Sequence, residues 1–292
     1  MAWLQLRVHT THPEFADELL LGQDAVSVSF VDAADDPVLE PAPGETPLWP
    51  STLTLGLFRD GTDPAPVIAT LRALLPEGAG LRVDAEIVED RDWVRVWLKD
   101  CEPMKFGHRL WVCPREKRVD EPGCETLLLD PGLAFGTGTH PTTALCLDWL
   151  AARPALASPV LDYGCGSGIL AIAALKLGAA RAVAYDIDPQ ALIASRDNAA
   201  VNGVGAALLT VEPDERVPPG PYPLILANIL AGPLIALAPQ LSGLLAAGGD
   251  LVLAGLLERQ ADEVRAAYAR WIDWQPEATR EGWTRLWGRR RS

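Results

Sequence analysis

The sequence is poor in residues that bind metals or form disulfides. It has five cysteines, an odd number, and no Cys-x-x-Cys pair. This pattern fits a reducing compartment and predicts neither a disulfide framework nor a zinc site. Of the four histidines, His9 and His12 have helical spacing, but the residues around them are typical of a strand that runs into a turn. We therefore expect no bound metal.

Segments that direct a chain into or across a membrane are also lacking. The first residues contain no basic region followed by a long apolar one, so no secretory signal is expected. Residues 224–241 are apolar enough to suggest a membrane span, but Asn228, Pro233, Pro239 and Gln240 interrupt the run. Such interruptions favour a strand, a loop and a helix. We expect a globular, cytoplasmic monomer.

Positively charged residues are few, and the excess of negative charge is unevenly distributed along the chain. The net charge is −14, from 25 Lys and Arg against 39 Asp and Glu. Residues 1–91 hold sixteen acidic side chains against five arginines, which gives −11 and leaves −3 for the remainder. Such a field repels nucleic-acid phosphate and speeds the encounter with basic proteins, although acidity can also serve solubility alone. We expect a basic protein partner, no direct nucleic-acid readout and no membrane contact.

Residues 160–178 contain a strand, a glycine turn and a helix. Two apolar residues end a buried strand, Gly164, Gly166 and Gly168 form the turn, and residues 169–177 form the helix. Glycines let a ligand approach the backbone closely, and free N–H groups at a helix start suit a carboxylate or phosphate. The stretch therefore predicts a nucleotide-binding turn.

The glycine spacing discriminates among nucleotide ligands. A dinucleotide fingerprint needs Gly or Ala three places after its second glycine, where this chain has Ile169, so NAD and FAD are disfavoured. The Gly-x-Gly-x-Gly pattern after Asp162 resembles instead motif I of methyltransferases that use S-adenosyl-L-methionine. About twenty residues on, Asp186 follows an apolar run at the place where such folds bind ribose hydroxyls. A structural glycine turn beside a solvated aspartate is the alternative.

The order of the elements predicts two domains of different kinds. Residues 3–88 show a strand-helix-strand-strand-helix-strand order, typical of a small α+β, ferredoxin-like sandwich. From residue 158 onward strands and helices alternate, which predicts an α/β domain with a doubly wound, mostly parallel sheet. Between them, Trp93 and Trp97 lie on one face of a connecting helix. We predict domains at 1–91 and 105–292, joined by a linker helix at 92–104.

Asn228 is the candidate for placing a methyl acceptor. It ends a predicted strand at the edge where α/β folds bind ligands. Its side-chain oxygen can accept N–H bonds from an amine, and a lysine, with a pKa of about 10.4, must be deprotonated before it attacks a methyl group. The sequence Asn-Ile-Leu-Ala at 228–231 has no aromatic ring to stack on a flipped base. An aliphatic amine is therefore the favoured acceptor.

A stretch rich in glycine and threonine, residues 130–143, precedes the glycine turn. Its composition suits a loop that folds over a bound ligand with hydroxyl and N–H groups. Thr142 or Thr143 can instead cap the helix predicted to begin at residue 143. His140 is a candidate general base, although a histidine before proline can also contribute a hydrogen bond alone.

Several stretches together resemble the PrmA family, the bacterial methyltransferases of large-subunit ribosomal protein eleven. The similar stretches are residues 133–143, 162–179, 186–189 and 227–231, with further likeness at Trp3, 43–45 and 89–93. The resemblance thus covers essentially the whole chain.

This resemblance implies a class I (Rossmann-like) methyltransferase domain that follows a substrate-recognition domain and a flexible linker. It implies N-methylation of lysine side chains and of the α-amino terminus of the basic ribosomal protein, free or assembled, with S-adenosyl-L-methionine as cofactor. The family's cofactor positions correspond to Thr143, Gly164, Asp186 and Asn228.

Two alternatives remain open. A methyltransferase of another protein amine or amide would carry the same residues, and Asn228 cannot separate the two. The other alternative is a ribosome-associated module that binds the cofactor without turnover.

Overall fold

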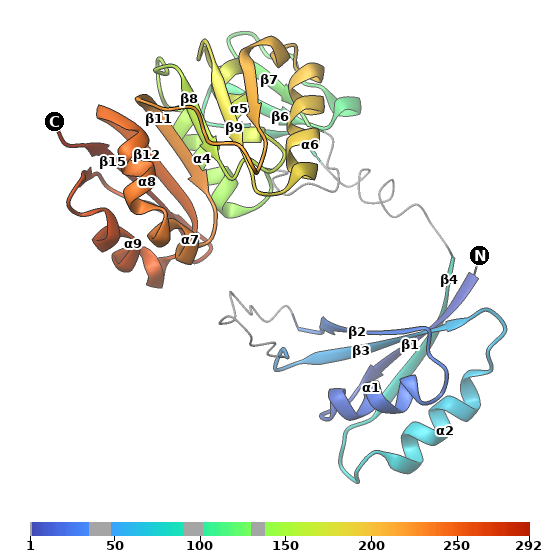
Figure 1. The fold of residues 1–292 in the computed structure, drawn as a ribbon. Coiled ribbons are helices and arrows are strands. Elements are labelled where there is room, and N and C mark those ends of the chain that lie inside the picture. The colour runs from blue at the N-terminus through green and yellow to red at the C-terminus, as the bar shows by residue number, and fades with distance from the viewer. Residues whose placement is uncertain (1, 35–47, 90–101, 130–137) are drawn as a thin grey trace. The chain divides into compact units, whose positions relative to one another are not determined.

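The computed structural model describes residues 2–34, 48–89, 102–129 and 138–292. The chain divides into two compact units, Met1–Trp93 and Val94–Ser292 (Figure 1). Most of the predicted linker helix, up to residue 101, lies outside the described residues. Its last position, Met104, begins a strand of the second unit instead of ending a helix.

The N-terminal unit is a four-stranded antiparallel sheet with two helices. Its elements are β1 (Ala2–His9), α1 (Pro13–Leu21), β2 (Ser27–Asp32), β3 (Thr52–Arg59), α2 (Pro64–Leu74) and β4 (Arg82–Glu89). The strand order is β2-β3-β1-β4, and Figure 1 shows both helices on one face. This chain order of elements is the one predicted from the sequence; the assignment to a ferredoxin-like class stays a prediction.

Alternation along β1 explains which face the helices cover. Leu4, Leu6 and Val8 are buried in the apolar core of this unit, together with Leu20 of α1. Arg7, between two of them, is exposed. Successive side chains of a strand point to opposite faces of the sheet. One face of β1 therefore packs on the helices, and the other carries Trp3, Gln5, Arg7 and His9.

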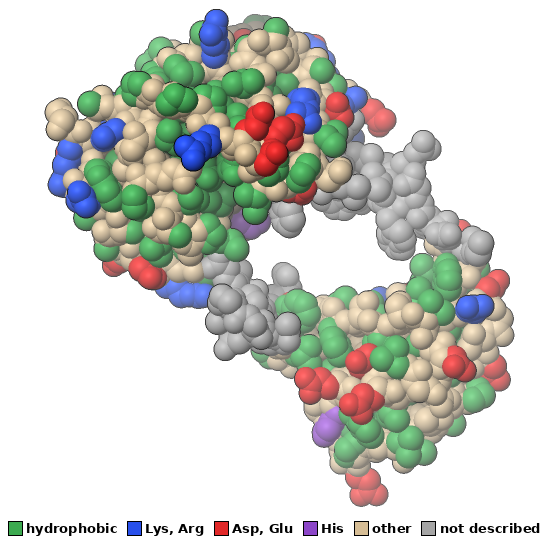
Figure 2. All heavy atoms as spheres, viewed as in Figure 1, with side chains coloured by type: hydrophobic (Ala, Val, Ile, Leu, Met, Phe, Trp, Pro, Cys, Tyr) green, Lys and Arg blue, Asp and Glu red, His purple; other side chains and the backbone are tan. Residues whose placement is uncertain are grey.

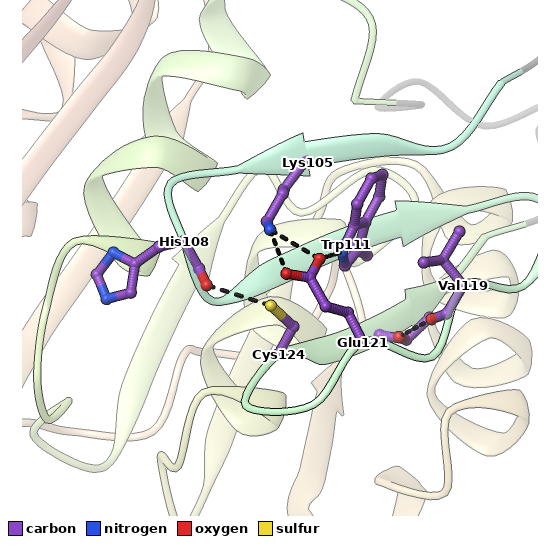
Figure 3. A network of polar contacts seen from close by, with 7 residues as sticks. Lys105, His108, Trp111, Val119, Glu121 and Cys124 are labelled. Atoms are coloured by element: carbon purple, nitrogen blue, oxygen red, sulfur yellow. Dashed lines mark hydrogen bonds and ion pairs between the residues drawn. The ribbon is translucent and has the colours of Figure 1, made fainter.

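The C-terminal unit opens with a three-stranded sheet of β5 (Met104–Phe106), β6 (Leu110–Cys113) and β7 (Glu125–Leu128). A polar network lies along it (Figure 3). Lys105 Nζ lies 2.7 Å from both carboxylate oxygens of Glu121, and Trp111 Nε1 donates to Glu121 Oε2 at 2.8 Å. Cys124 Sγ donates to the carbonyl of His108 at 3.2 Å. The network joins β5 and β6 to the segment that leads into β7.

The larger sheet carries the alternating elements predicted from residue 158 onward. Its strands are β8 (Val160–Tyr163), β9 (Ala182–Tyr185), β10 (Leu208–Val211), β11 (Tyr222–Asn228), β12 (Leu245–Leu257), β13 (Ile272–Trp274), β14 (Ala278–Arg280) and β15 (Trp283–Arg290). Across the sheet the order is β10-β9-β8-β11-β12-β15-β13, with β14 paired to β15. The strands from β8 to β12 are parallel, and β15 is antiparallel to its neighbours. The predicted doubly wound, mostly parallel sheet is confirmed.

Helices cover both faces of this sheet. They are α4 (Pro141–Ala151), α5 (Ile169–Lys176), α6 (Pro189–Val201), α7 (Ala231–Ala236), α8 (Ala238–Leu244) and α9 (Ala261–Tyr268), with short 3-10 helices η1 (Arg115–Lys117), η2 (Gly205–Ala207) and η3 (Glu258–Gln260). Leu224 and Leu226 of β11 pack in the apolar cluster with α4, α5 and α6, whereas Ile225 and Ala227 pack in the one with α7, α8 and α9. Burial of β11 on both faces explains its continuous apolar run.

Some helix boundaries differ from the sequence prediction. α4 begins at Pro141, two residues early, because His140 caps it. After the strand at 222–228, where the sequence predicts one helix, there are two, α7 and α8, since Pro239 has no N–H for the preceding turn and is accommodated in the first turn of a new helix. α9 ends at Tyr268, and a short strand that the sequence did not predict, β13, follows it.

Within the described part of the chain, no helix has the length and apolarity that a bilayer crossing needs.

Candidate functional site

The strands β8 and β11 are neighbours in the large sheet, and the sheet extends from this pair in opposite directions. On the side of β8 the next strands are β9 and β10, and on the side of β11 the next strand is β12. The strands β11, β8 and β9 pair in a fixed register. When this register is continued just past the strand ends, Asn228, Gly164 and Asp186 lie opposite one another at the ends of the three neighbouring strands. The carboxyl ends of strands at such a switch point form the ligand site of open α/β sheets.

The glycine turn after β8 has little room for side chains. Gly164, Gly166 and Gly168 have φ angles of 78°, 53° and 77°, a left-handed conformation that other residues rarely adopt. A Cβ on Gly164 would lie 2.2 Å from Cγ2 of Ile229, and one on Gly168 would lie 2.7 Å from Oγ of Ser195. Glycine at positions 164 and 168 is therefore required by neighbouring elements as well as by the turn.

The N–H groups of two of these glycines are occupied within the protein. Gly164 N donates to the carbonyl of Tyr185 at 2.8 Å, and Gly166 N donates to Asp186 Oδ2 at 2.9 Å. The tight return of the chain brings these acceptors within reach. The turn therefore offers a ligand a surface free of Cβ atoms, and its N–H groups at these two positions serve the fold.

Asp186 lies at the end of β9, beside the turn. Its Oδ2 accepts the bond from Gly166, and its Oδ1 accepts from Asp188 N at 3.0 Å. The side chain is half-buried. A carboxylate oxygen has more than one acceptor site, so each oxygen can still accept a bond from a hydroxyl. The structure thus brings the predicted residues Gly164, Gly166 and Asp186 together.

Asp162 lies fully buried beneath the turn. Its Oδ2 accepts from Ala171 N in the first turn of α5 at 2.9 Å, whereas its Oδ1 has no hydrogen-bond partner among the described residues. Burial raises the pKa of this carboxyl to about 7; the bond from Ala171 opposes the rise, and the charge of Asp186 adds to it. Asp162 fastens β8 to α5, a role that the sequence analysis did not assign.

Two side chains of α6 hold the turn in place. Ser195 Oγ donates to the carbonyl of Gly166 at 3.0 Å, and Asn198 Nδ2 donates to the carbonyl of Ser167 at 2.9 Å. Both side chains are buried, and their spacing of three residues puts them on one face of α6. The sequence analysis missed both, although polar residues on an otherwise apolar helix face were a usable signal.

Asn228 and Thr143 meet on the other side of the switch point. Asn228 Nδ2, at the end of β11, donates to Thr143 Oγ1 in the first turn of α4 at 3.1 Å. Thr143 is buried and Asn228 is half-buried. The amide nitrogen only donates, so Oδ1 is the atom of Asn228 that can accept a hydrogen bond from a substrate.

His140 caps α4. Its Nδ1 accepts from Thr142 N at 3.3 Å and lies 2.8 Å from Thr142 Oγ1. The imidazole packs edge-on against the indole of Trp283, with ring centroids 4.8 Å apart. Burial lowers the pKa of His140, and the charge of Glu281 opposes this shift. The ring is therefore neutral near pH 7, and with Nδ1 as an acceptor its proton lies on Nε2.

Part of the glycine- and threonine-rich loop, residues 130–137, lies outside the described residues. At its end, Gly138 is buried, and a Cβ on it would lie 3.4 Å from Cδ1 of Ile169, the first residue of α5. The loop therefore ends beside the glycine turn. Among the described residues, no group of His, Cys, Asp or Glu side chains is placed to hold a metal ion.

The chain is similar to known proteins along its whole length. The family model described as Ribosomal protein L11 methyltransferase (PrmA) matches residues 2–291. The protein of that name from Pseudomonas aeruginosa (strain LESB58) is 54% identical over 295 residues, 100% of each chain. Its counterpart from Aeromonas hydrophila subsp. hydrophila is 50% identical over 293 residues, 99% of each chain. The crystal structure of a ribosomal protein L11 methylase from Lactobacillus delbrueckii subsp. bulgaricus matches at 32% identity and a TM-score of 0.59, over 66% of this chain and 100% of that one.

Proposed function

Since this chain belongs to the ribosomal protein L11 methyltransferase (PrmA) family, we propose that it transfers methyl groups from S-adenosyl-L-methionine to lysine ε-amino groups and the N-terminal α-amino group of ribosomal protein L11. The family and the class I methyltransferase fold that the resemblance implied are both confirmed. One observation carries the proposal: Asn228, held by Thr143, lies level with the glycine turn at the switch point of the sheet.

The residues of the turn fit the cofactor. At Gly166 no Cβ stands between the backbone and the methionyl end of the cofactor, whereas the missing Cβ of Gly164 makes room for Ile229. Asp186, half-buried and with acceptor sites to spare, suits the ribose hydroxyls. Thr143 and Asn228 are proposed to border the same site. When bound, S-adenosyl-L-methionine supplies an electrophilic methyl group on a sulfonium.

Asn228 suits an amine that must be neutral. A lysine ε-amino group has a pKa of about 10.4, and only its deprotonated form has the lone pair that attacks a methyl group. The Oδ1 of Asn228 can accept an N–H bond from the neutral amine and orient it, without the full negative charge that would stabilise the ammonium form. An aspartate at this position would favour the unreactive ion instead.

His140 enters the proposal as a hydrogen-bond donor. In the tautomer that caps α4, its one basic nitrogen, Nδ1, is occupied by the N–H of Thr142, and Nε2 carries the proton. A general base needs a free lone pair, so His140 could take a proton only after the cap is released. Its Nε2–H remains available to a substrate oxygen or to water.

Substrate recognition is assigned to the acidic N-terminal domain, residues 1–91, with residues 92–104 as linker and 105–292 as catalytic domain. The described face of this unit shows many Asp and Glu side chains and few Lys or Arg (Figure 2). A net charge of −11 over residues 1–91 complements a basic ribosomal protein and speeds its encounter. A cytoplasmic monomer acting on the free or assembled protein completes the proposal.

The test uses labelled S-adenosyl-L-methionine with free L11 and with intact large ribosomal subunits. Wild-type protein should label L11 on amines, as mass spectrometry of its peptides would show. Asn228→Ala should bind the cofactor but transfer slowly, and Asn228→Asp should be slower than wild type with a rate that rises as pH increases. Labelling of RNA alone would overturn the proposal. Cofactor binding without transfer, unchanged by Asn228→Ala, would favour a module without turnover.

A further inference from the structure

A groove of about 610 Å³ lies at the edge of the large sheet opposite Asn228. One wall consists of the residues that precede β11 and those around the start of β12. The rest of the lining consists of Arg270 and Trp271, which follow α9, and of Arg290, Arg291 and Ser292 at and after the end of β15. The methyltransferase site lies at the carboxyl ends of the parallel strands, so the groove is a separate feature.

Strand pairing gathers the arginines in one place. β13 pairs with β15 so that Ile272 lies opposite Arg290, and the N–H of Arg291 donates to the carbonyl of Trp271 at 2.8 Å. The dipeptides 270–271 and 290–291 are therefore neighbours, although twenty residues separate them in the chain. Their side chains share a groove because of the sheet topology.

The positive charge in the groove is poorly neutralised. No Asp or Glu is among its lining residues. Arg291 Nε donates to Asp273 Oδ1 at 2.7 Å, whereas Arg290 donates to the backbone carbonyl of Leu245. Arg270 is exposed and lies over the indole of Trp271, 4.6 Å from the ring centroid. Within the described residues, one of these three guanidinium groups has a carboxylate partner.

The groove also stands out against the charge of the chain. The chain carries −14 overall, yet from Arg265 onward it has seven arginines and three acidic residues. Figure 2 shows Lys and Arg side chains on the part of the surface where Figure 1 marks the C-terminus. Most of the negative charge belongs to residues 1–91, and the remainder of the chain carries −3.

We propose that this groove binds phosphate groups and that a single-stranded RNA is their source. Guanidinium groups donate paired N–H bonds that match the oxygens of a phosphate, and they bind it more strongly than neutral donors do. An RNA backbone presents phosphates at regular intervals, so one strand can satisfy arginines from two segments at once. Trp271, half-buried at the same groove, carries Arg270 over its indole, so a base can stack on this ring by displacing that guanidinium.

This binding goes beyond the proposed methyl transfer and does not depend on it. Contacts to phosphate carry no sequence information, so the proposed binding does not require direct nucleic-acid readout. An acidic peptide also complements arginines, but it lacks planar bases for Trp271 and the tetrahedral oxygens of phosphate. The observations therefore favour RNA, and an acidic peptide becomes a competitor in the test.

The experiment measures fluorescence anisotropy of a short labelled oligouridine with the full chain at two salt concentrations. The double variant Arg270→Glu/Arg291→Glu should weaken binding by about tenfold or more and reduce its dependence on salt. The control Arg59→Glu/Arg72→Glu, at exposed positions of β3 and α2 in the other unit, changes the net charge equally and should stay within about twofold of wild type. Equal binding by the double variant and the control would overturn the proposal.

Further measurements separate the sources and guard against misfolding. Inorganic phosphate that protects wild type from thermal unfolding, without any binding of oligouridine, would overturn RNA as the source. Displacement of the RNA by oligoglutamate as readily as by inorganic phosphate would overturn phosphate recognition. If the glutamate variants do not fold, Arg270→Gln/Arg291→Gln removes the charges more mildly. Methyl transfer to free L11 should be unchanged in either pair, so the two proposals fail independently.

Discussion

Ile229 occupies the space in which a side chain of Gly164 would begin, because a Cβ on Gly164 would lie 2.2 Å from Cγ2 of Ile229. β12 encloses the same residue from another side: a Cβ on Gly255 would lie 2.4 Å from the Ile229 carbonyl oxygen. Both glycines have positive φ, 78° and 85°. Since Ile229 directly follows Asn228, these two glycines fix the backbone that positions the proposed acceptor-binding amide.

Gly255→Ala should therefore impair both folding and methyl transfer. The added Cβ forces the backbone of Ile229 away, and we expect a loss of about 2–3 kcal/mol in unfolding free energy together with a lower kcat. Gly248→Ala is the matched control, on the same strand with a φ of 70° and nothing within 4 Å of the added atom. It should cost about 1 kcal/mol from backbone strain alone and leave kcat unchanged. Equal effects in urea unfolding and in kcat would contradict the role given to Gly255.

Thr143 should matter through its hydroxyl. Thr143→Val keeps the shape but removes the acceptor of the Asn228 amide, so we expect kcat to fall about tenfold, which corresponds to about 1.4 kcal/mol. Thr143→Ser retains the hydroxyl and should retain most of kcat. In an Asn228→Ala background, Thr143→Val should add no further loss in a double-mutant cycle. Additive losses would show that the two side chains act separately.

Asp162 should make the fold less stable as pH rises. Its pKa is raised by burial from 3.8 to about 7, so the folded protein prefers the protonated carboxyl. The stabilising contribution is full below the unfolded pKa and is lost as pH rises through about 7, and by linkage it amounts to an order of 4 kcal/mol. Asp162→Asn should remove this part of the pH dependence in chemical denaturation. A difference between wild type and variant that stays constant with pH would argue against the shift.

His140 should contribute with the opposite sign. Its pKa is lowered by burial, so the folded protein prefers the neutral ring that caps α4. The contribution is present above the ordinary pKa of about 6.5 and is lost as pH falls through the lowered folded value. His140→Ala should cost about 1 kcal/mol by removing the cap, whereas His140→Asn should retain it.

The same pair of variants tests the chemical role of His140. As a donor through Nε2, it can be replaced by the amide of Asn with a modest loss of kcat. A fall in kcat by several orders of magnitude in His140→Asn, with stability unchanged, would reinstate His140 as a general base. The pH dependence of kcat, measured above and below the titration of the ring, distinguishes the two.

The sequence predicts those parts of the site that depend on local order along the chain. Gly164, Asp186 and Asn228 each follow an apolar strand, and parallel strands bring such positions to one edge of the sheet. Their neighbourhood was therefore predictable from residue order alone. The predicted fold class rested on the same alternation of strands and helices.

Residues whose role depends on distant partners were not predictable in this way. Ser195 bonds to a carbonyl 29 positions earlier, and Trp283 packs against His140 from the other end of the domain. A polar residue on an apolar face of α6 makes Ser195 unusual, but no local pattern identifies the partner of either residue, because partners are chosen by packing between elements. β13 was missed for the same reason: its three residues form a strand only because β15 lies beside them.

β15 is inserted between β12 and β13, although both precede it in the chain. A nascent polypeptide that has left the ribosome only as far as β13 therefore has a gap in its sheet. When β15 enters, it delivers Trp283 to His140 at one end and Arg290 to the basic groove at the other. Until β15 joins the sheet, neither Trp283 nor Arg290 is in place, so both regions depend on the same strand.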